Sequence, residues 1–272
     1  MRKFSVLVVL LFSAFVGFAQ QDLRNLAYGK ERQQNLDLFL PKKIDAKTPV
    51  LLLLHGGAWS LGGKEFTDKT ARDLRDRGFV VANVDYRYVS ENVHAKDLLD
   101  DIGNAEKYMR EVASKYGFAS KGYHFSGISA GAHLAMLYSY TRNSGVKSIA
   151  VLCGPTQFDT EENKAHIAKF QLSDVVEKLA DSKYGDGKPG RKFTEISPYA
   201  QIKNIPTLLF HGDKDDLVLY SQATLMRDKL KQAKVPSQLI TMQGKGHDCG
   251  MNQADSEKVV LDNIENWIVK YN

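Results

Sequence analysis

The sequence predicts an α/β fold, in which helices cover both faces of a mostly parallel sheet, and three observations predict it. Continuous apolar runs of five or six residues, which suit strands buried on both faces, recur along the chain. Between them lie segments with apolar residues spaced by threes and fours, the pattern of one buried helix face. The length of 272 residues, of which 43% are apolar, suits a single domain of this class.

Residues 1–19 differ from the rest of the chain and are expected to form a secretory signal peptide. Arg2 and Lys3 precede an apolar run that ends at Phe15, and small residues follow at the usual cleavage spacing. The run is short for a membrane span, which needs about 20 residues. We therefore expect a secreted or periplasmic protein without stable membrane insertion after cleavage, with residues 20–272 as its single domain.

The folded part is expected to open with an antiparallel hairpin and to continue with buried strands. Residues 28–34 and 36–40 read as its two alternating segments, and Pro41 ends the second of them. Continuous apolar runs then predict strands at 49–54, 79–84, 122–126, 147–152, 206–210 and 237–242.

Helical patterns alternate with these strands. The clearest extends from Ala95 to Tyr116, and weaker ones cover 223–233 and 260–268. Such alternation predicts helices on both faces of the sheet and a ligand site at the carboxyl ends of the strands.

The long interruption of this alternation, residues 154–204, is expected to form a small cap. The segment is rich in charged residues of both signs. A lid that meets a lipid surface needs an amphipathic helix with a broad apolar face, and this segment looks too polar for that role.

Composition and motifs exclude several classes of function. Arg2 and Lys3 are two of the 37 basic residues, so 35 basic and 32 acidic residues remain outside the first segment, and the two kinds are interspersed. The chain therefore lacks the basic surface of a nucleic-acid-binding protein. We expect no metal, because no histidine or carboxylate pair lies at ligand spacing on one helix. We expect no other cofactor, because neither a phosphate-cradling loop nor a dinucleotide fingerprint occurs.

The two cysteines, Cys153 and Cys249, are too few for a disulfide scaffold. Both are expected in loops near the active face of the sheet. Export would permit one bridge between them. Two buried free thiols are the favoured interpretation.

A pentapeptide at the end of a predicted strand has the pattern of a nucleophile elbow. It reads Gly127-Ile128-Ser129-Ala130-Gly131 and leads into a helical run. Glycines two positions before and after the serine remove side chains that would block the sharp turn needed to expose its hydroxyl. Ser129 is the expected nucleophile. Because the pattern also occurs by chance in loops, its partners elsewhere in the chain decide its weight.

A serine nucleophile needs a base within hydrogen-bond reach. Of the seven histidines, His247 lies in a late loop directly after the last predicted strand, and it is the expected base. The others fall in a strand, a helix, polar stretches or glycine-containing turns: His55, His94, His124, His133, His166 and His211.

The base in turn needs an acid that fixes its tautomer, and the acid should follow another strand end. The segment 208–218 offers three aspartates, of which we favour Asp215. Asp213 and Asp216 remain alternatives that could instead cap a turn or face solvent. The chain order Ser129, Asp215, His247 is the nucleophile-acid-base order of the α/β-hydrolase class.

The developing oxyanion needs hydrogen-bond donors. His55-Gly56-Gly57-Ala58-Trp59 follows the first long buried strand, and its glycines allow backbone N–H groups to turn inward. Gly57 and Ala58 are the best donors there, and the N–H of Ala130, at the start of a helix, is the expected third. Trp59 is a candidate substrate-binding residue, although a large aromatic side chain at this turn is equally compatible with packing.

Together these motifs resemble the secreted α/β-hydrolase esterases with a His-Gly-Gly-Ala-Trp oxyanion motif. That group borders on hormone-sensitive-lipase-like esterases, feruloyl and acetyl xylan esterases, and kynurenine-formamidase-like hydrolases. The resemblance is carried by four blocks that span nearly the whole mature chain: His55–Trp59, Asp85–Arg87, Gly127–Ala135, and Ile196–Pro198 leading to His211–Val218. The combination is specific to the superfamily and not to a substrate.

The resemblance implies an α/β-hydrolase fold and the hydrolysis of carboxylic esters through an acyl-enzyme. In similar proteins the acid lies four residues after the histidine of the His-Gly pair, which is Asp215 here. Asp85 and Arg87 are structural in this family. Ala58 stands where hormone-sensitive-lipase-like enzymes usually have a third glycine, which favours the xylan-esterase-like and formamidase-like branch.

The expected substrates are small-molecule or polysaccharide esters. Export, a polar cap and small glycine-rich turns favour short acyl or feruloyl groups on a polar alcohol such as a polysaccharide. An amidase or exopeptidase-like serine hydrolase is the alternative, because the same triad cleaves amides. An inactive fold that serves as a binding module normally requires a lost triad member, and none is missing here.

Overall fold

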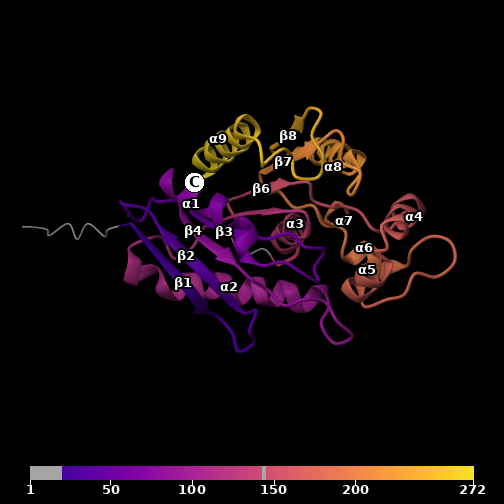
Figure 1. Cartoon of the computed structure of the whole chain (residues 1–272), viewed down its shortest axis with the longest axis horizontal. Helices are drawn as coiled ribbons and strands as arrows, with labels where there is room; N and C mark the ends of the chain where they lie inside the picture. The colour runs from indigo at the N-terminus through magenta and orange to yellow at the C-terminus, as the bar shows by residue number, and fades with distance from the viewer. Residues whose placement is uncertain (1–19, 143–144) are drawn as a thin grey trace, which may run out of the picture.

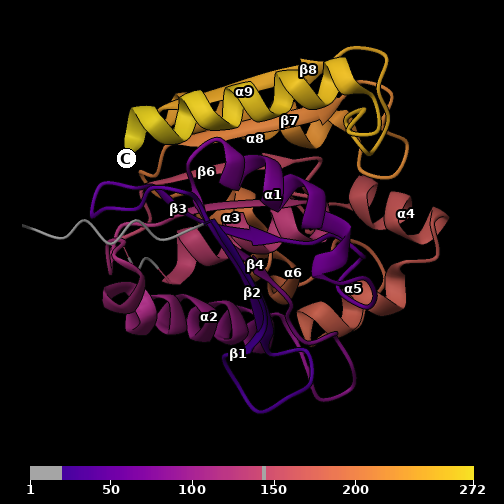
Figure 2. The same cartoon turned by 60° about the vertical axis from the view of Figure 1, so that its left-hand side comes forward.

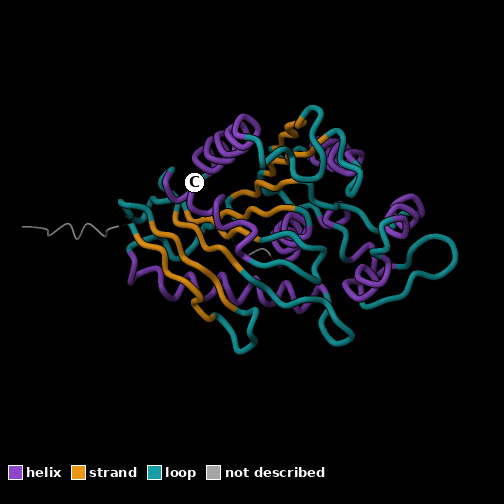
Figure 3. Tube along the Cα trace, viewed as in Figure 1, coloured by secondary structure: helices purple, strands orange, loops and turns teal. Residues whose placement is uncertain are grey.

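Eight strands form one mixed sheet in the part of the chain that a computed structural model describes, residues 20–142 and 145–272. The expected signal peptide lies outside the described residues. The order across the sheet is β1-β2-β4-β3-β5-β6-β7-β8, and only the pairs β1–β2 and β2–β4 are antiparallel. Figure 3 shows these strands in orange. The α/β-hydrolase fold expected from the sequence is confirmed by this topology.

The strands fall close to their expected positions except at the start of the chain. The opening hairpin pairs β1 with β2, and residues 28–34 form the loop between them. This loop is not a strand because the side-chain oxygen of Gln34 accepts hydrogen bonds from the N–H groups of Lys30 and Glu31 and closes a turn. The bounds are β1 Gln21–Ala27, β2 Asn35–Leu40, β3 Val50–Leu54, β4 Val80–Val84, β5 His124–Ile128, β6 Ser148–Leu152, β7 Thr207–Gly212 and β8 Ser237–Met242.

Helices cover both faces of the sheet, and alternate side chains of the central strands point to each face. Leu52 and Leu54 of β3 join the core beneath α2, α3 and α8, whereas Leu51 and Leu53 join the core beneath α1 and α9. Figure 1 shows α1 and α9 on one side of the sheet and α2 on the other. The bounds are α1 Asp68–Asp76, α2 Ala95–Tyr116, α3 Ala130–Arg142, α8 Tyr220–Gln232 and α9 Ala254–Tyr271. None of the helices in the described part is long and apolar enough to cross a membrane.

The segment between β6 and β7 folds as four short helices at one end of the sheet, as Figure 2 shows for α4 and α5. Thr160 caps the first of them, since its hydroxyl accepts a hydrogen bond from the N–H of Asn163. These helices lie within residues 154–204, the segment that the sequence predicts to be a cap and that is called the cap below. The bounds are α4 Glu161–Lys169, α5 Ser173–Ala180, α6 Arg191–Glu195 and α7 Pro198–Gln201.

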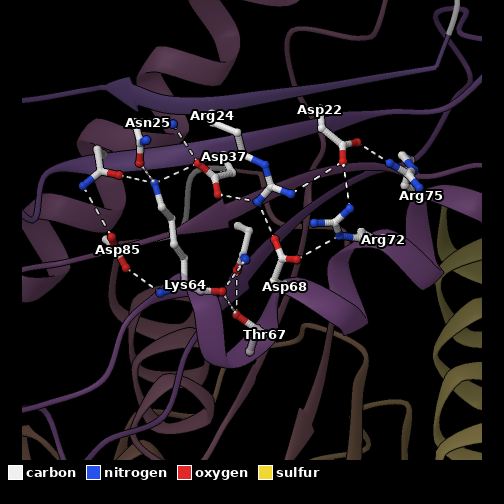
Figure 4. Close-up of polar contacts among 12 residues, drawn as sticks. Asp22, Arg24, Asn25, Asp37, Lys64, Thr67, Asp68, Arg72, Arg75 and Asp85 are labelled. Carbon is white, nitrogen blue, oxygen red and sulfur yellow. Dashed lines mark hydrogen bonds and ion pairs between the residues drawn. The ribbon is translucent and has the colours of Figure 1, made fainter.

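A polar network fastens the short 3₁₀ helix Lys64–Thr67 to the edge of the sheet (Figure 4). The Lys64 ammonium lies 2.8 Å from Asp37 on β2 and donates a hydrogen bond to Asn25 on β1. The Lys64 N–H donates to Asp85 at 2.6 Å. These contacts fix the segment that follows the turn at residues 55–59, so the edge hairpin contributes to the position of that turn.

Candidate active site

Ser129 stands on a sharp turn between β5 and α3. Its φ is 55°, in the left-handed region that non-glycine residues rarely adopt. A Cβ at Gly127 would lie 2.5 Å from the backbone of Gly131, and one at Gly131 would lie 2.2 Å from the carbonyl oxygen of Leu54. Both glycines are therefore required by close backbone approach, which is the steric basis of the elbow.

The structure brings Ser129, His247 and Asp215 together from three separate loops. The Oγ of Ser129 lies 2.8 Å from Nε2 of His247, in the loop after β8. The Nδ1 of His247 lies 2.8 Å from Oδ2 of Asp215, in the loop after β7. With Nδ1–H donating to the carboxylate, Nε2 is free to accept the serine proton, which is the tautomer that a general base needs.

The carboxylate of Asp215 is buried and held by further donors. It accepts hydrogen bonds from the N–H groups of Leu217 and Val218, each at 2.9 Å, and its Oδ2 lies 3.0 Å from Nε2 of His211. Burial alone would raise the pKa of Asp215, but the hydrogen bonds from His211 and His247 outweigh burial and hold this pKa well below its usual range. A lowered pKa keeps Asp215 ionised near neutral pH, as the orienting acid of the base requires.

The other two aspartates of the loop lie elsewhere. Asp213 accepts a hydrogen bond from the N–H of Gly244 at 2.6 Å. This bond joins the loop that carries Asp215, the acid loop, to the loop that carries His247, the base loop. Asp216 is exposed to solvent. Of the three candidates from the sequence, only Asp215 lies against His247.

The expected oxyanion donors line the same cavity as Ser129: Gly57, Ala58 and Ala130. Gly57 has a φ of 124°, and a Cβ there would lie 2.0 Å from the carbonyl oxygen of Leu61, so only glycine fits. Ala58 also has a positive φ, of 46°. Strained backbone at a ligand-facing turn is a common feature of functional sites.

The turn that carries Gly57 and Ala58 is supported from behind by residues of the β4–α2 loop. The hydroxyl of Tyr86 donates to the carbonyl oxygen of His55 at 2.6 Å, and the two rings stack with centroids 4.3 Å apart. Arg87 forms a bidentate ion pair with the buried carboxylate of Asp101. These contacts agree with the structural role that the resemblance implies for this stretch.

Trp59 is almost completely buried, with 4% exposure, and also lines the cavity. Its indole N–H donates to Nδ1 of His133 on α3 at 3.1 Å, while Nε2 of His133 contacts the carbonyl oxygen of Ile196 at 2.7 Å. The neutral imidazole, with its proton on Nε2, satisfies both contacts. Burial lowers the pKa of His133 to about 4, which keeps the ring neutral. Trp59 therefore ties the oxyanion turn to the nucleophile helix.

A cavity of about 510 Å³ extends from Ser129 and His247 beneath the cap. Its lining is mainly apolar and comes from the oxyanion side and from the cap: Trp59, Leu61, Phe66, Phe158, Ile167, Phe170 and Val176. The charged residues of the cap are exposed or half-buried, while His166 is a polar cap residue that lines the cavity. This mainly apolar lining differs from the polar surroundings that the composition of residues 154–204 suggested.

Two residues of the site had no catalytic role in the sequence-based interpretation. His211 supports Asp215, and His133 supports Trp59. Both lie inside the blocks that carry the family resemblance. Their position in these blocks is the signal in the sequence that could have indicated a role in the site. Cys153 and Cys249 are buried free thiols, the form that the sequence favoured.

Comparison with known proteins shows which family the chain matches. The model of the BD-FAE family matches residues 36–230, more than half of the chain. The chain belongs to the BD-FAE family. Among curated relatives, this BD-FAE protein is 26% identical to isoprenylcysteine alpha-carbonyl methylesterase of Arabidopsis thaliana over 85% of the chain and 57% of that protein. It is 31% identical to kynurenine formamidase of Salmo salar over 43% of the chain and 38% of that protein. The chain thus spans less than two thirds of the curated relatives it matches.

Solved structures resemble this BD-FAE protein over almost all of its length. A truncated carbohydrate esterase from gut microbiota superposes with a TM-score of 0.73 at 19% identity, covering 93% of this chain and 98% of that one. An inhibited esterase B from Lactobacillus rhamnosis superposes with a TM-score of 0.76 at 19% identity, covering 93% and 88%. At this identity the likeness establishes the shared fold.

Proposed function

We propose that the protein is a serine hydrolase that cleaves carboxylic esters through an acyl-enzyme. The observation that carries the proposal is the continuous chain of hydrogen bonds from Ser129 through His247 to Asp215, at the carboxyl ends of the parallel strands and open to a cavity. Membership in the BD-FAE family and the esterase names of several similar proteins support it.

In the first half-reaction the Oγ of Ser129 attacks the ester carbonyl while Nε2 of His247 takes the hydroxyl proton. The N–H groups of Gly57, Ala58 and Ala130 stabilise the resulting oxyanion, each worth roughly 3 kcal/mol in the transition state. His247 then gives its proton to the departing alcohol. In the second half-reaction water attacks the acyl-enzyme along the same path, and His247 returns the proton to Ser129.

For the acyl group we propose a feruloyl or similar aromatic acid on a polar alcohol such as a polysaccharide. The apolar lining at Phe66, Phe170 and Val176 supports an aromatic group over acetyl, which would leave most of the 510 Å³ cavity unfilled. The carbohydrate esterase among the similar structures supports the polysaccharide. We further propose export to the periplasm or the exterior, on the basis of residues 1–19.

Labelling by an active-site phosphonate tests the nucleophile. The wild type should be labelled on one residue, and Ser129→Ala should not be labelled. Ser139→Ala serves as the matched control, because Ser139 lies on the helix that follows the elbow and its hydroxyl donates to the carbonyl oxygen of Ala135, one turn earlier on the same helix. An unlabelled wild type, or label that persists in Ser129→Ala, would contradict the proposal.

A panel of matched acetyl, butyryl and feruloyl esters tests the acyl group. We expect the highest kcat/KM for the feruloyl ester and a loss of about tenfold for that ester alone in Phe170→Ala, because the lost apolar contact is worth roughly 1–2 kcal/mol. Val269→Ala, at an exposed apolar position, is the control. Equal losses for all three esters would contradict an aromatic acyl site, and release of ferulate from substituted xylan tests the alcohol.

The amidase alternative is kept open by the similarity to kynurenine formamidase. Kinetics on an ester and an anilide of the same acid separate the two activities. We expect the ester to be cleaved faster, and a preference for the anilide would assign the protein to the amidases.

A further inference from the structure

Two sulfur atoms meet beneath the catalytic loops. Cys153 is the first residue after β6, and Cys249 lies two residues after His247. Their Sγ atoms are 2.7 Å apart, and both side chains are fully buried. Neither thiol takes part in the proposed reaction, so the close pair needs another explanation.

The pair lies where the three catalytic loops converge. The N–H of Cys153 donates to the carbonyl oxygen of Phe210 on β7 at 2.8 Å, just before the acid loop. The residue before it, Leu152, accepts the N–H of Ser129 at 2.9 Å. The Sγ of Cys153, a carboxylate oxygen of Asp215 and a ring nitrogen of His247 all lie within 4.8 Å of one another. Cys249 is the partner that belongs to the base loop.

The backbone holds both cysteines in unusual conformations. The φ angles of Cys153 and Cys249 are 49° and 55°, in the left-handed region that disfavours residues with a Cβ. Such conformations persist only where the surrounding structure fixes them. The two thiols are therefore held against each other by the fold of the two loops.

We propose that Cys153 and Cys249 form a disulfide when the chain folds in an oxidising compartment, and that this bond fastens the loop of His247 to the end of β6. A disulfide needs a sulfur separation of about 2 Å. A small inward shift from the observed contact of 2.7 Å therefore makes the bond. The triad is already assembled with both thiols free, so the bond acts on the stability of the base loop and not on the chemistry.

The bond forms by exchange with a low-molecular-weight disulfide such as oxidised glutathione, or with the disulfide of a protein oxidant. One cysteine thiolate attacks the reagent and expels one thiol, and the second cysteine attacks the mixed disulfide and expels the other. The two cysteines lose two electrons and two protons, and the reagent gains both. The contact with Cys249 and burial raise the pKa of the Cys153 thiol well above its usual range, so exchange takes place during folding, before the pair is buried.

Refolding of the full-length chain, with and without oxidised glutathione, tests the bond directly. After denaturation and alkylation, the chain folded with the oxidant should carry no alkyl group and should weigh about 2 Da less than the unalkylated reduced chain. It should also yield a peptide pair joined through Cys153 and Cys249. Two alkylated cysteines, or glutathione adducts without a cross-link, would overturn the proposal. Ser129→Ala should cross-link equally, so this result is independent of the proposed hydrolase activity.

The effect on the loop is measured on the same two preparations. The bond closes a loop of 96 residues, so the oxidised form should melt on the order of 10 °C higher. Hydrogen exchange in residues 244–251 should also be slower. Cys249→Ala should give one melting temperature under both conditions. If that variant does not fold, the comparison of oxidised and reduced wild type still decides: equal melting and equal exchange would overturn the role assigned to the bond.

Discussion

Asp215 accepts hydrogen bonds from His247, from two backbone N–H groups and from His211. Of these donors, His211 is the side chain that a substitution can remove without removing the base. His211 is buried, and its Nε2 also contacts the carbonyl oxygen of Val218 at 2.8 Å. Its ring therefore orients the acid without touching the substrate cavity.

We expect His211→Phe to lower kcat about tenfold with little change in KM, because a hydrogen bond to a charged group is worth about 1.5 kcal/mol or more. Steady-state kinetics on a simple ester measure the change. His124→Phe is the control, since it removes a buried histidine that contacts Ser148 and Asn272. An unchanged kcat in His211→Phe would show that the backbone donors suffice.

The contact between Trp59 and His133 also belongs to the residue scale, since it joins the oxyanion turn to α3 through one hydrogen bond. His133→Leu leaves the buried indole N–H without its acceptor and should cost about 1–3 kcal/mol of unfolding free energy. Adding Trp59→Phe removes the orphaned donor and should recover part of that loss. Urea unfolding of the wild type, the two single variants and the double variant gives the coupling energy between the two side chains. Strictly additive losses would mean that the contact contributes nothing.

At the scale of elements, the edge hairpin and the 3₁₀ helix Lys64–Thr67 form one unit. Lys64 is largely buried and pairs with Asp37, whose other oxygen pairs with Arg24 at 2.8 Å. Removing one partner of a buried pair leaves a charge that is only partly compensated.

Lys64→Met should lower the unfolding free energy by about 3 kcal/mol. It should also lower kcat, because this segment follows directly on the oxyanion turn. Lys107→Met, which removes an exposed ion pair with Glu111 on α2, is the control and should cost less than about 1 kcal/mol. Chemical denaturation and ester turnover measure the two effects. If only stability falls, the turn does not depend on the hairpin.

At the scale of the whole molecule, two buried neutral histidines contribute to the response to acid. Burial lowers the pKa of His124 and of His133 to about 4 from an ordinary value of 6.5. Between these values the unfolded chain binds more protons than the folded one, so unfolding is favoured as the pH falls from 6.5 towards 4. The stability that the neutral rings contribute is complete above pH 6.5, the histidine pKa in the unfolded chain. It is lost as the pH falls below about 4, the pKa of these rings in the folded chain.

We expect the unfolding free energy to fall through this window by on the order of 3 kcal/mol for each ring. Urea denaturation at several values from about pH 7 to pH 4 measures the slope. His124→Phe should remove about half of the pH dependence that the two rings produce. A flat profile in the wild type would contradict the burial of neutral imidazoles.

The sequence by itself determined the alternation of strands and helices, the elbow at Ser129 and the chain order of the triad. These features are local: glycine spacing, apolar runs and loops that follow strand ends are visible in a few neighbouring residues. The first strand was misplaced at residues 28–34, because the side chain of Gln34 closes that segment into a turn, and no periodicity reports such a contact.

The tertiary structure supplied the physical reason that Asp215, the aspartate favoured from the sequence, meets His247, because Asp213, Asp215 and Asp216 differ in burial and in the groups they contact rather than in chemistry. It also decided that the cap presents apolar side chains to the cavity, since the composition of a segment does not say which side of each helix faces inward. The contact between Cys153 and Cys249 is of the same kind, because residues 96 positions apart meet only when the sheet brings its strand ends together.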